Sequence, residues 1–203
     1  MPLLATAVMS AALAALQPGA LPIDLHEPTR ISASEDGSAL IVEGPITDGA
    51  FANFQRALRA YPIARHVILK SPGGLMFEAD RIAHVVRERR MTTYAQTLCA
   101  SACTVILIAG RDRTAAPGTR VGFHRPNVSL SRTPARTLQL TRRLYERAGL
   151  AASFTARIYA TPFETVWYPG VDEMIAAGVL TRRIGPSNTA YAALGRLSAL
   201  NPR

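Results

Sequence analysis

The chain has 203 residues, 48% hydrophobic and 18% charged, a composition that excludes an intrinsically disordered protein and allows one domain with a buried core. Its formal net charge is +9, and Lys70 is its single lysine. Such charge can attract nucleic acid or anionic lipid, but no nucleic-acid-binding motif accompanies the arginines. We therefore expect solvated basic faces and no nucleic-acid partner.

The N-terminal segment is almost wholly apolar or small. Residues 2–16 carry no charge, and the first charged side chain is Asp24. The segment has the length of a signal-peptide hydrophobic region and is short for a membrane span, although the usual preceding positive charge is missing. We expect residues 1–21 to be a signal peptide or N-terminal anchor. The protein would then be periplasmic or otherwise exported, with membrane attachment if the segment is retained.

Strand-like and helix-like segments alternate as far as Phe123. The predicted strands are residues 38–43, 66–70, 92–97, 114–116 and 120–123. The predicted helices are residues 47–61, with Thr47 or Asp48 as the cap, 75–90 and 101–110. This alternation is typical of parallel β-α-β crossovers. It predicts an α/β fold with a site at the carboxyl ends of the strands.

After Pro126 the pattern becomes helical. The predicted elements are helices over residues 134–149, 151–159 and 171–177 and a final strand over residues 179–181. In the first of these helices, apolar residues such as Leu144 and Tyr145 face inward and four arginines face outward. We expect one domain over residues 22–185 and a polar tail over residues 186–203.

The segment around Ser101 carries the strongest functional signal. Ser101 lies between small neighbours where a predicted strand meets a predicted helix. A tight turn at such a junction exposes a serine as a nucleophile. The segment therefore predicts a serine hydrolase site.

A nucleophilic serine needs a base, and the chain has four histidines. Those expected to be structural or on the surface are His26, His66 and His84. His124 follows a strand, and period-two alternation places it with Gly122 on the face opposite Val121 and Phe123. We predict that His124 is the base and that Gly122 leaves room beside its ring.

Main-chain N–H groups near Ser101 could hold a developing oxyanion. The turn Ser71-Pro72-Gly73-Gly74 follows a strand, and its glycines allow close approach of a substrate, although any strand-to-helix turn can use glycine. The N–H of Ala102 would be a second donor at a helix start. We therefore predict Gly73, Gly74 and Ala102 as the oxyanion hole.

Two cysteines, Cys99 and Cys103, flank Ser101. They make a weak metal site because no histidine adjoins them. A disulfide is conceivable in an oxidising compartment, where it would hold the turn that presents Ser101. We expect two buried thiols instead, because few turn geometries suit a bridge at this spacing.

Four motifs occur in order: Ser71-Pro72-Gly73-Gly74, Cys99-Ala100-Ser101-Ala102-Cys103, Ala109-Gly110 and Arg120-Val121-Gly122-Phe123-His124-Arg125-Pro126. This set resembles the Clp protease proteolytic subunit and, more closely, exported bacterial proteins with the same ClpP/crotonase-type fold. The resemblance covers about residues 40–181. It implies a spiral of β-β-α units, Ser101 as nucleophile, His124 as base, and Gly74 and Ala102 as oxyanion donors.

The resemblance also implies an acidic third member before a C-terminal helix. Residues 161–168 contain no aspartate, and Glu164 is the nearest acidic candidate. Asp172 and Glu173 match charges at the start of a helix. The region between His124 and Gly178 is shorter than in the protease, which argues against its double-ring barrel and leaves the form of any homo-oligomer open.

Three hypotheses follow. The first is an exported serine peptidase or related hydrolase that acts on peptide or protein substrates through Ser101 and His124, without cofactor or metal. The second is a catalytically silent binding or assembly module. The third is a membrane-associated peptidase with a Ser–Lys dyad, for which Lys70 is the one available lysine.

Overall fold

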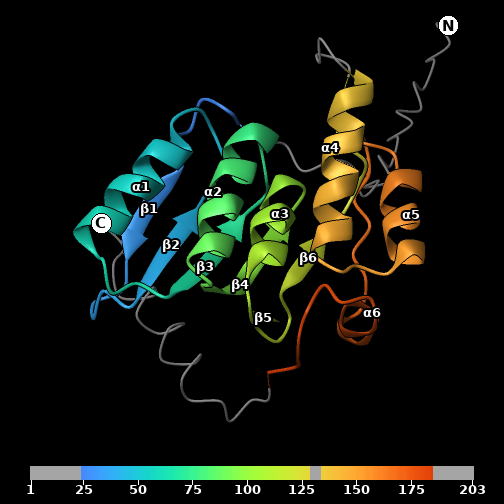
Figure 1. The fold of residues 1–203 in the computed structure, drawn as a ribbon. Coiled ribbons are helices and arrows are strands. Elements are labelled where there is room, and N and C mark those ends of the chain that lie inside the picture. Colours follow the sequence, from blue (N-terminus) through green and yellow to red (C-terminus); the bar gives the residue numbers. More distant parts are fainter. Residues whose placement is uncertain (1–23, 129–133, 185–203) are drawn as a thin grey trace, which may run out of the picture.

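A computed structural model of the protein describes residues 24–128 and 134–184 (Figure 1). The strands are β1 (Arg30–Ala33), β2 (Ala39–Glu43), β3 (His66–Ser71), β4 (Thr92–Ala100), β5 (Arg113–Ala115) and β6 (Arg120–Gly122). The helices are α1 (Ala50–Ala60), α2 (Met76–Glu88), α3 (Ala102–Ala109), α4 (Pro134–Arg147), α5 (Ala152–Ala160) and α6 (Val171–Ala176). The predicted α/β architecture is therefore confirmed.

The six strands form one sheet in the order β1-β2-β3-β4-β5, with β6 also paired to β4. β1 runs antiparallel to β2, and the other pairs are parallel. β4 is long enough to pair with β5 through Thr93–Ala95 and with β6 through Leu98–Ala100. β6 therefore lies beside the carboxyl end of β4, where sites form in parallel sheets.

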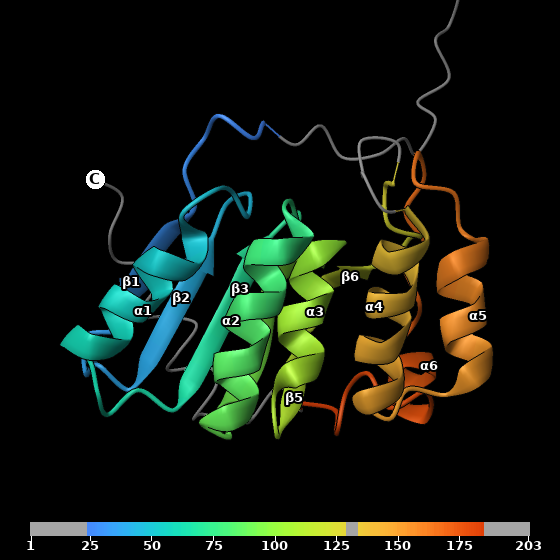
Figure 2. The ribbon, with the colours of Figure 1, turned by 45° about the horizontal axis from the view of Figure 1, so that its top comes forward.

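The helices α1, α2 and α3 cover one face of the sheet, and α3 lies between α2 and α4 in both views (Figures 1 and 2). Every residue of α3 is buried, because its sequence is apolar all round except for Thr104. The helices α4, α5 and α6 gather at the β6 end of the molecule. In α4, Thr141, Leu144 and Tyr145 are buried and the arginines are exposed, largely as predicted.

Arg113 joins this C-terminal region to the sheet. Its guanidinium donates hydrogen bonds to the carbonyl oxygens of Ile108 (3.2 Å), Ala148 (3.4 Å) and Gly178 (2.8 Å). These carbonyls lie in or after α3, α4 and α6, so one half-buried side chain supports all three.

Three local features differ from the sequence-based expectations. The strand β1 was not predicted; it forms because the turn at Asp36 and Gly37 returns the chain antiparallel to β2. No strand covers residues 179–181, where Thr181 instead bonds to Arg113 from irregular backbone. The start of α1 has no side-chain cap from Thr47 or Asp48.

The start of α1 is satisfied from another helix. The N–H of Phe51 donates to the buried carboxylate of Glu78 in α2 (2.8 Å). Thr47 is engaged elsewhere, because its hydroxyl accepts the N–H of Thr29 (3.0 Å). A carboxylate near the positive end of a helix dipole is favourable, so a distant residue replaces the predicted local cap.

Within the described residues, no helix has the length and apolarity needed to cross a bilayer. The predicted signal peptide or anchor over residues 1–21 and the predicted tail over residues 186–203 lie outside these residues.

Candidate active site

Ser101 lies between the end of β4 and the start of α3. Its φ is 53° and its ψ is −126°, a conformation that L-residues rarely adopt. Arg90, at the end of α2, is the other described non-glycine residue with positive φ. Backbone strain of about 1–3 kcal/mol at a single residue persists only where the surroundings impose it. Ser101 therefore has the sharp strand-to-helix turn that its sequence predicts.

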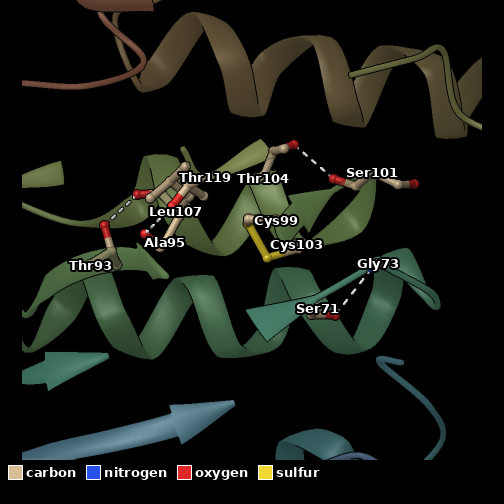
Figure 3. The surroundings of a disulfide bond; sticks show 10 residues. All are labelled: Ser71, Gly73, Thr93, Ala95, Cys99, Ser101, Cys103, Thr104, Leu107 and Thr119. Atoms are coloured by element: carbon tan, nitrogen blue, oxygen red, sulfur yellow. Dashed lines mark hydrogen bonds between the residues drawn. A yellow bond between two sulfur atoms is a disulfide. The ribbon is translucent and has the colours of Figure 1, made fainter. Parts of the chain in front are cut away.

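Two hydrogen bonds to the main chain of Ser101 fix this turn, and Figure 3 shows the one from Thr104. The N–H of Ser101 donates to the carbonyl of Gly122 in β6 (2.9 Å). The hydroxyl of Thr104 donates to the carbonyl of Ser101 (2.7 Å). Together they join the turn to the neighbouring strand and to the first turn of α3.

A disulfide between Cys99 and Cys103 spans the turn (Figure 3). The expectation of two free thiols was therefore wrong. The sharp bend at Ser101 brings the two Cα atoms to 5.3 Å, within the usual range for a disulfide. Both cysteines are fully buried, so the disulfide is shielded from solvent and links the residues on either side of Ser101.

The glycine turn after β3 packs directly against the Ser101 turn. Gly73 has φ +103°, and a Cβ there would lie 2.6 Å from the Ala100 carbonyl oxygen and 2.7 Å from the Ser101 Cβ. At Gly74, with φ +141°, a Cβ would lie 2.2 Å from the Ile46 carbonyl oxygen. Both glycines are required, because a side chain at either position would separate packed main chains.

The predicted oxyanion donors differ in availability. The N–H of Gly73 donates to the Ser71 hydroxyl (3.1 Å), so it is already engaged and does not fit that role. Within residues 24–128 and 134–184, the N–H groups of Gly74 and Ala102 have no acceptor. Ala102 is the first residue of α3, where an unpaired N–H is inherent to the helix. Two unpaired donors therefore remain beside Ser101.

His124 follows β6 and is 9% exposed. Its Nδ1 lies 2.8 Å from the carbonyl oxygen of Arg125. A carbonyl can only accept, so Nδ1 carries the proton and Nε2 of the neutral ring is left as an acceptor. Burial lowers the pKa of His124, while the Arg125 carbonyl and the charge of Glu164 act in the opposite direction. The ring is therefore held neutral, as a general base requires.

Glu164 does not take the place predicted for it. The side chain is exposed, and the Arg125 carbonyl occupies the histidine nitrogen that a catalytic acid would bind. Glu164 acts on His124 only through its charge. The local reason is that residues 162–165 form a surface turn closed by the bond from the Thr165 N–H to the Pro162 carbonyl.

Ser101 and His124 line one cavity of about 400 Å³. Gly74 and Ala100 line it as well, and much of the remainder is apolar, including Leu75, Phe163 and Val166. In the described part of the chain, no hydrogen bond links Ser101 to His124. That Ser101 Oγ and a ring nitrogen of His124 come within hydrogen-bonding distance therefore stays a prediction. A cavity of this size admits a few residues of an extended peptide.

Two further expectations about neighbouring residues change. The space at Gly122 is occupied by Val166 and Tyr168, whose atoms would lie 2.5 and 2.6 Å from a Cβ there, so it does not serve the imidazole. Lys70 is absent from the described lining of the cavity. The Ser–Lys hypothesis therefore gains no support.

The groups that position the His124 ring were not predicted from the sequence. The carbonyl of Arg125 carries no side-chain signal, so no sequence pattern could reveal it. Phe163 packs edge-on against the His124 ring with centroids 5.4 Å apart. Its neighbour Glu164 was predicted as the third catalytic member because it is acidic, but the ring of Phe163 makes the contact with His124.

The described residues contain no group of three or more histidine, cysteine or acidic side chains placed to hold a metal ion.

Solved structures show the same architecture. ClpP1 from Listeria monocytogenes superposes with a TM-score of 0.64 at 19% identity, over 76% of this chain and 95% of that one. A point mutant of it gives 0.62 at 19% identity, over 75% and 94%. This chain has a ClpP-like fold. A serine-to-alanine mutant of the 1510-N membrane-bound stomatin-specific protease gives 0.57 at 19% identity, over 76% of this chain and 82% of that one.

No known protein family and no curated protein sequence matches the chain. The likeness to these proteases is therefore one of fold.

Proposed function

We propose that the protein is a serine peptidase of the ClpP-like type, with Ser101 as nucleophile and His124 as general base. The observation that carries the proposal is the pair of unpaired N–H groups, from Gly74 and Ala102, beside a serine held at positive φ. Such paired donors stabilise the oxyanion of acyl transfer and are otherwise costly to leave unsatisfied.

The chemistry assigns one role to each group. Nε2 of His124 takes the proton of Ser101 Oγ as this oxygen attacks the scissile carbonyl carbon. The oxyanion that forms is held by the N–H groups of Gly74 and Ala102. The imidazolium then gives its proton to the leaving amine, and a water molecule, activated by the same ring, releases the acyl group from Ser101. The Arg125 carbonyl keeps the ring in the required tautomer throughout.

A catalytically silent binding module is the second candidate. It is favoured by the absence of a carboxylate on His124 Nδ1, because a carbonyl stabilises an imidazolium less than an acid does. In that case the same cavity would bind a peptide without cleaving it.

We further propose that the protein is exported and acts on peptide or protein substrates, as a monomer or a homo-oligomer. The Cys99–Cys103 disulfide supports export, because structural disulfides persist in oxidising compartments. Membrane attachment would rest on residues 1–21 alone.

The test is labelling with a fluorophosphonate probe, followed by hydrolysis of a quenched fluorescent peptide library. The native protein should be labelled at Ser101 and should cleave peptides. The Ser101→Ala variant should do neither, while its melting temperature stays close to that of the native protein. An unlabelled native protein that binds the library without cleaving it would establish the second candidate instead.

A further inference from the structure

A groove between α2 and α4 is distinct from the Ser101 cavity. Its volume is about 370 Å³, and its lining shares no residue with that cavity. The lining residues are Phe51, Asp80, Arg81, His84, Arg87, Leu140, Arg143, Leu144 and Arg147. The fully buried α3 lies between α2 and α4 (Figure 2), and residues of these two helices make up most of the lining.

The walls of the groove are strongly basic. Four arginines face one carboxylate, Asp80. Arg81 is already partnered, since it lies 3.8 Å from Glu78 and stacks on the Phe51 ring at 4.0 Å. His84 is paired with Glu88 (3.1 Å).

The other three arginines, Arg87, Arg143 and Arg147, have no acidic partner in the described part of the chain. They come from both walls, and all three are exposed. A single guanidinium group can bind a carboxylate through two parallel hydrogen bonds. The arrangement of the three arginines therefore suits an acidic ligand that lies between the two helices.

The floor of the groove is apolar. Phe51 and Leu144 are almost buried, while Leu140 is 52% exposed. A single phosphate would leave the apolar surface unused and would not fill the volume. An apolar side chain flanked by carboxylates matches both the floor and the walls.

The ligand does not come from the undescribed parts of this chain. Residues 1–23, 129–133 and 185–203 contain no aspartate or glutamate. Charge complementarity therefore requires another molecule.

We propose that the α2–α4 groove is a docking site for an acidic peptide segment of a partner protein, with one large apolar residue seated on Leu140 and Leu144. The site is separate from Ser101, so it does not depend on the proposed peptidase activity. It would recruit that partner protein to the α2–α4 face.

The experiment is fluorescence anisotropy with three fluorescein-labelled hexapeptides. The probe is Glu-Asp-Leu-Phe-Glu-Asp, and its controls replace either the acids with lysine or the two apolar residues with serine. The first peptide should bind, the lysine peptide should not, and the serine peptide should bind several-fold more weakly. Equal binding of the first and the serine peptide would reduce the site to charge attraction and overturn the proposal.

Variants locate the binding. Arg143→Glu with Arg147→Glu should weaken the first peptide at least about tenfold, through loss of charge-assisted contacts. The matched control is Arg56→Glu with Arg59→Glu, an equal charge change on exposed positions of α1 outside the groove. An equal loss in the control would overturn the proposal.

Three further measurements test the apolar floor, the α2 wall and lipid binding. Leu140→Ser, at an exposed position, should weaken binding of the first peptide without changing the charge of the groove. If the α4 double variant does not fold, Arg87→Glu tests the α2 wall in its place. Phosphatidylglycerol vesicles should bind the α4 double variant and the α1 control alike. Vesicle binding that is lost only with Arg143 and Arg147, and that displaces the peptide, would make the groove a lipid site instead.

Discussion

Ser101 and His124 line the same cavity, but different parts of the chain hold them. Ser101 is fixed mainly from nearby in the sequence, by the Cys99–Cys103 disulfide and the Thr104 hydroxyl, with one main-chain hydrogen bond to Gly122 of β6. His124 is fixed from much later in the sequence. Its neighbour Phe123 exchanges two main-chain hydrogen bonds with Trp167, at 2.8 and 2.9 Å.

The contacts that hold His124, here called the histidine side, extend into the C-terminal region. The N–H of Arg125 donates to the Thr161 carbonyl (3.0 Å), and the Phe123 ring packs edge-on against Phe154 with centroids 5.2 Å apart. The contacts that hold Ser101, here called the nucleophile side, instead lie at the start of α3, which is wholly buried. The two members of the catalytic pair can therefore be disturbed separately, and they should fail in different ways.

The largest effect is expected where the glycine turn meets the nucleophile side. Gly73→Ala would place a Cβ against Ala100 and Ser101, and we expect a loss of about 2–4 kcal/mol in the free energy of unfolding from overpacking and positive φ together. Activity should fall at least about a hundredfold, because the turn would be displaced by about 1 Å. Denaturant melts and peptide hydrolysis measure both.

Gly118→Ala is the matched control for this variant. Gly118 also has a positive φ, +78°, but nothing lies within 4 Å of the place that a Cβ would take there, so it isolates the backbone strain. That strain alone should cost about 1–2 kcal/mol. Equal losses in the two variants would mean that contact between the turns contributes nothing.

Lowering the pH should reduce activity, because it protonates His124 on the histidine side. Because burial lowers the pKa of His124 below 6.5, activity should be level at neutral pH and fall about tenfold per pH unit only below that lowered value. Unfolding restores the ordinary pKa of 6.5, so the unfolded state binds the extra proton first and stability also falls as the pH drops below 6.5.

Ring-proton NMR titration measures these pKa values directly. Burial also lowers the pKa of His66, so His66→Gln serves as the assignment control. A His124 that titrates at or above 6.5 would contradict its burial and its role as a base held neutral.

Removing the disulfide should affect the nucleophile side alone. For Cys99→Ala with Cys103→Ala we expect a loss of about 2 kcal/mol in stability, since the bridge closes a short loop. Turnover should fall about tenfold, within the range caused by small misplacements of a reacting group. The His124 titration should not move. A variant with native turnover would show that Thr104 and Gly73 position Ser101 without the bridge.

Arg113→Met, on the histidine side, should lower activity less than the preceding changes, although its effect on stability is large. Loss of its bonds to three carbonyls should lower stability by about 2–4 kcal/mol and loosen residues 148–178. Turnover at 25 °C should stay within a few-fold, because Phe123 and Trp167 still pair. Hydrogen exchange locates the change. Arg111→Met, at the exposed neighbouring position, is the control and should exchange like the native protein.

The sequence predicted the nucleophile side well. Ser101 and its strand-to-helix turn follow from local residue types, as do the helices α1, α2 and α3 to within a few residues. The disulfide was not predicted because it depends on the unusual φ and ψ of Ser101, which the residue types of the segment do not indicate.

The histidine side was less predictable because its contacts are distant and use the main chain. Pairing of Phe123 with Trp167 depends on the path of the intervening helices, and any residue could supply the Arg125 carbonyl. The expectation for Glu164 relied on residue type near the right place, without information on which way the loop turns. Long-range register of this kind is set by tertiary packing.

The smallest effect is expected at Glu164. Its carboxylate is exposed and acts on His124 only through charge, so Glu164→Gln should lower activity less than about threefold and move the acid limb slightly to lower pH. The direction follows because the negative charge raises the pKa of His124, and high salt should shrink the difference by screening. Phe163→Leu, which removes the ring contact to His124 and leaves the charge, is the matched comparison and should cost more activity than Glu164→Gln. A steep loss in Glu164→Gln that salt leaves unchanged would instead mean that the loop closes over His124 during turnover and that the carboxylate replaces the Arg125 carbonyl as the partner of Nδ1.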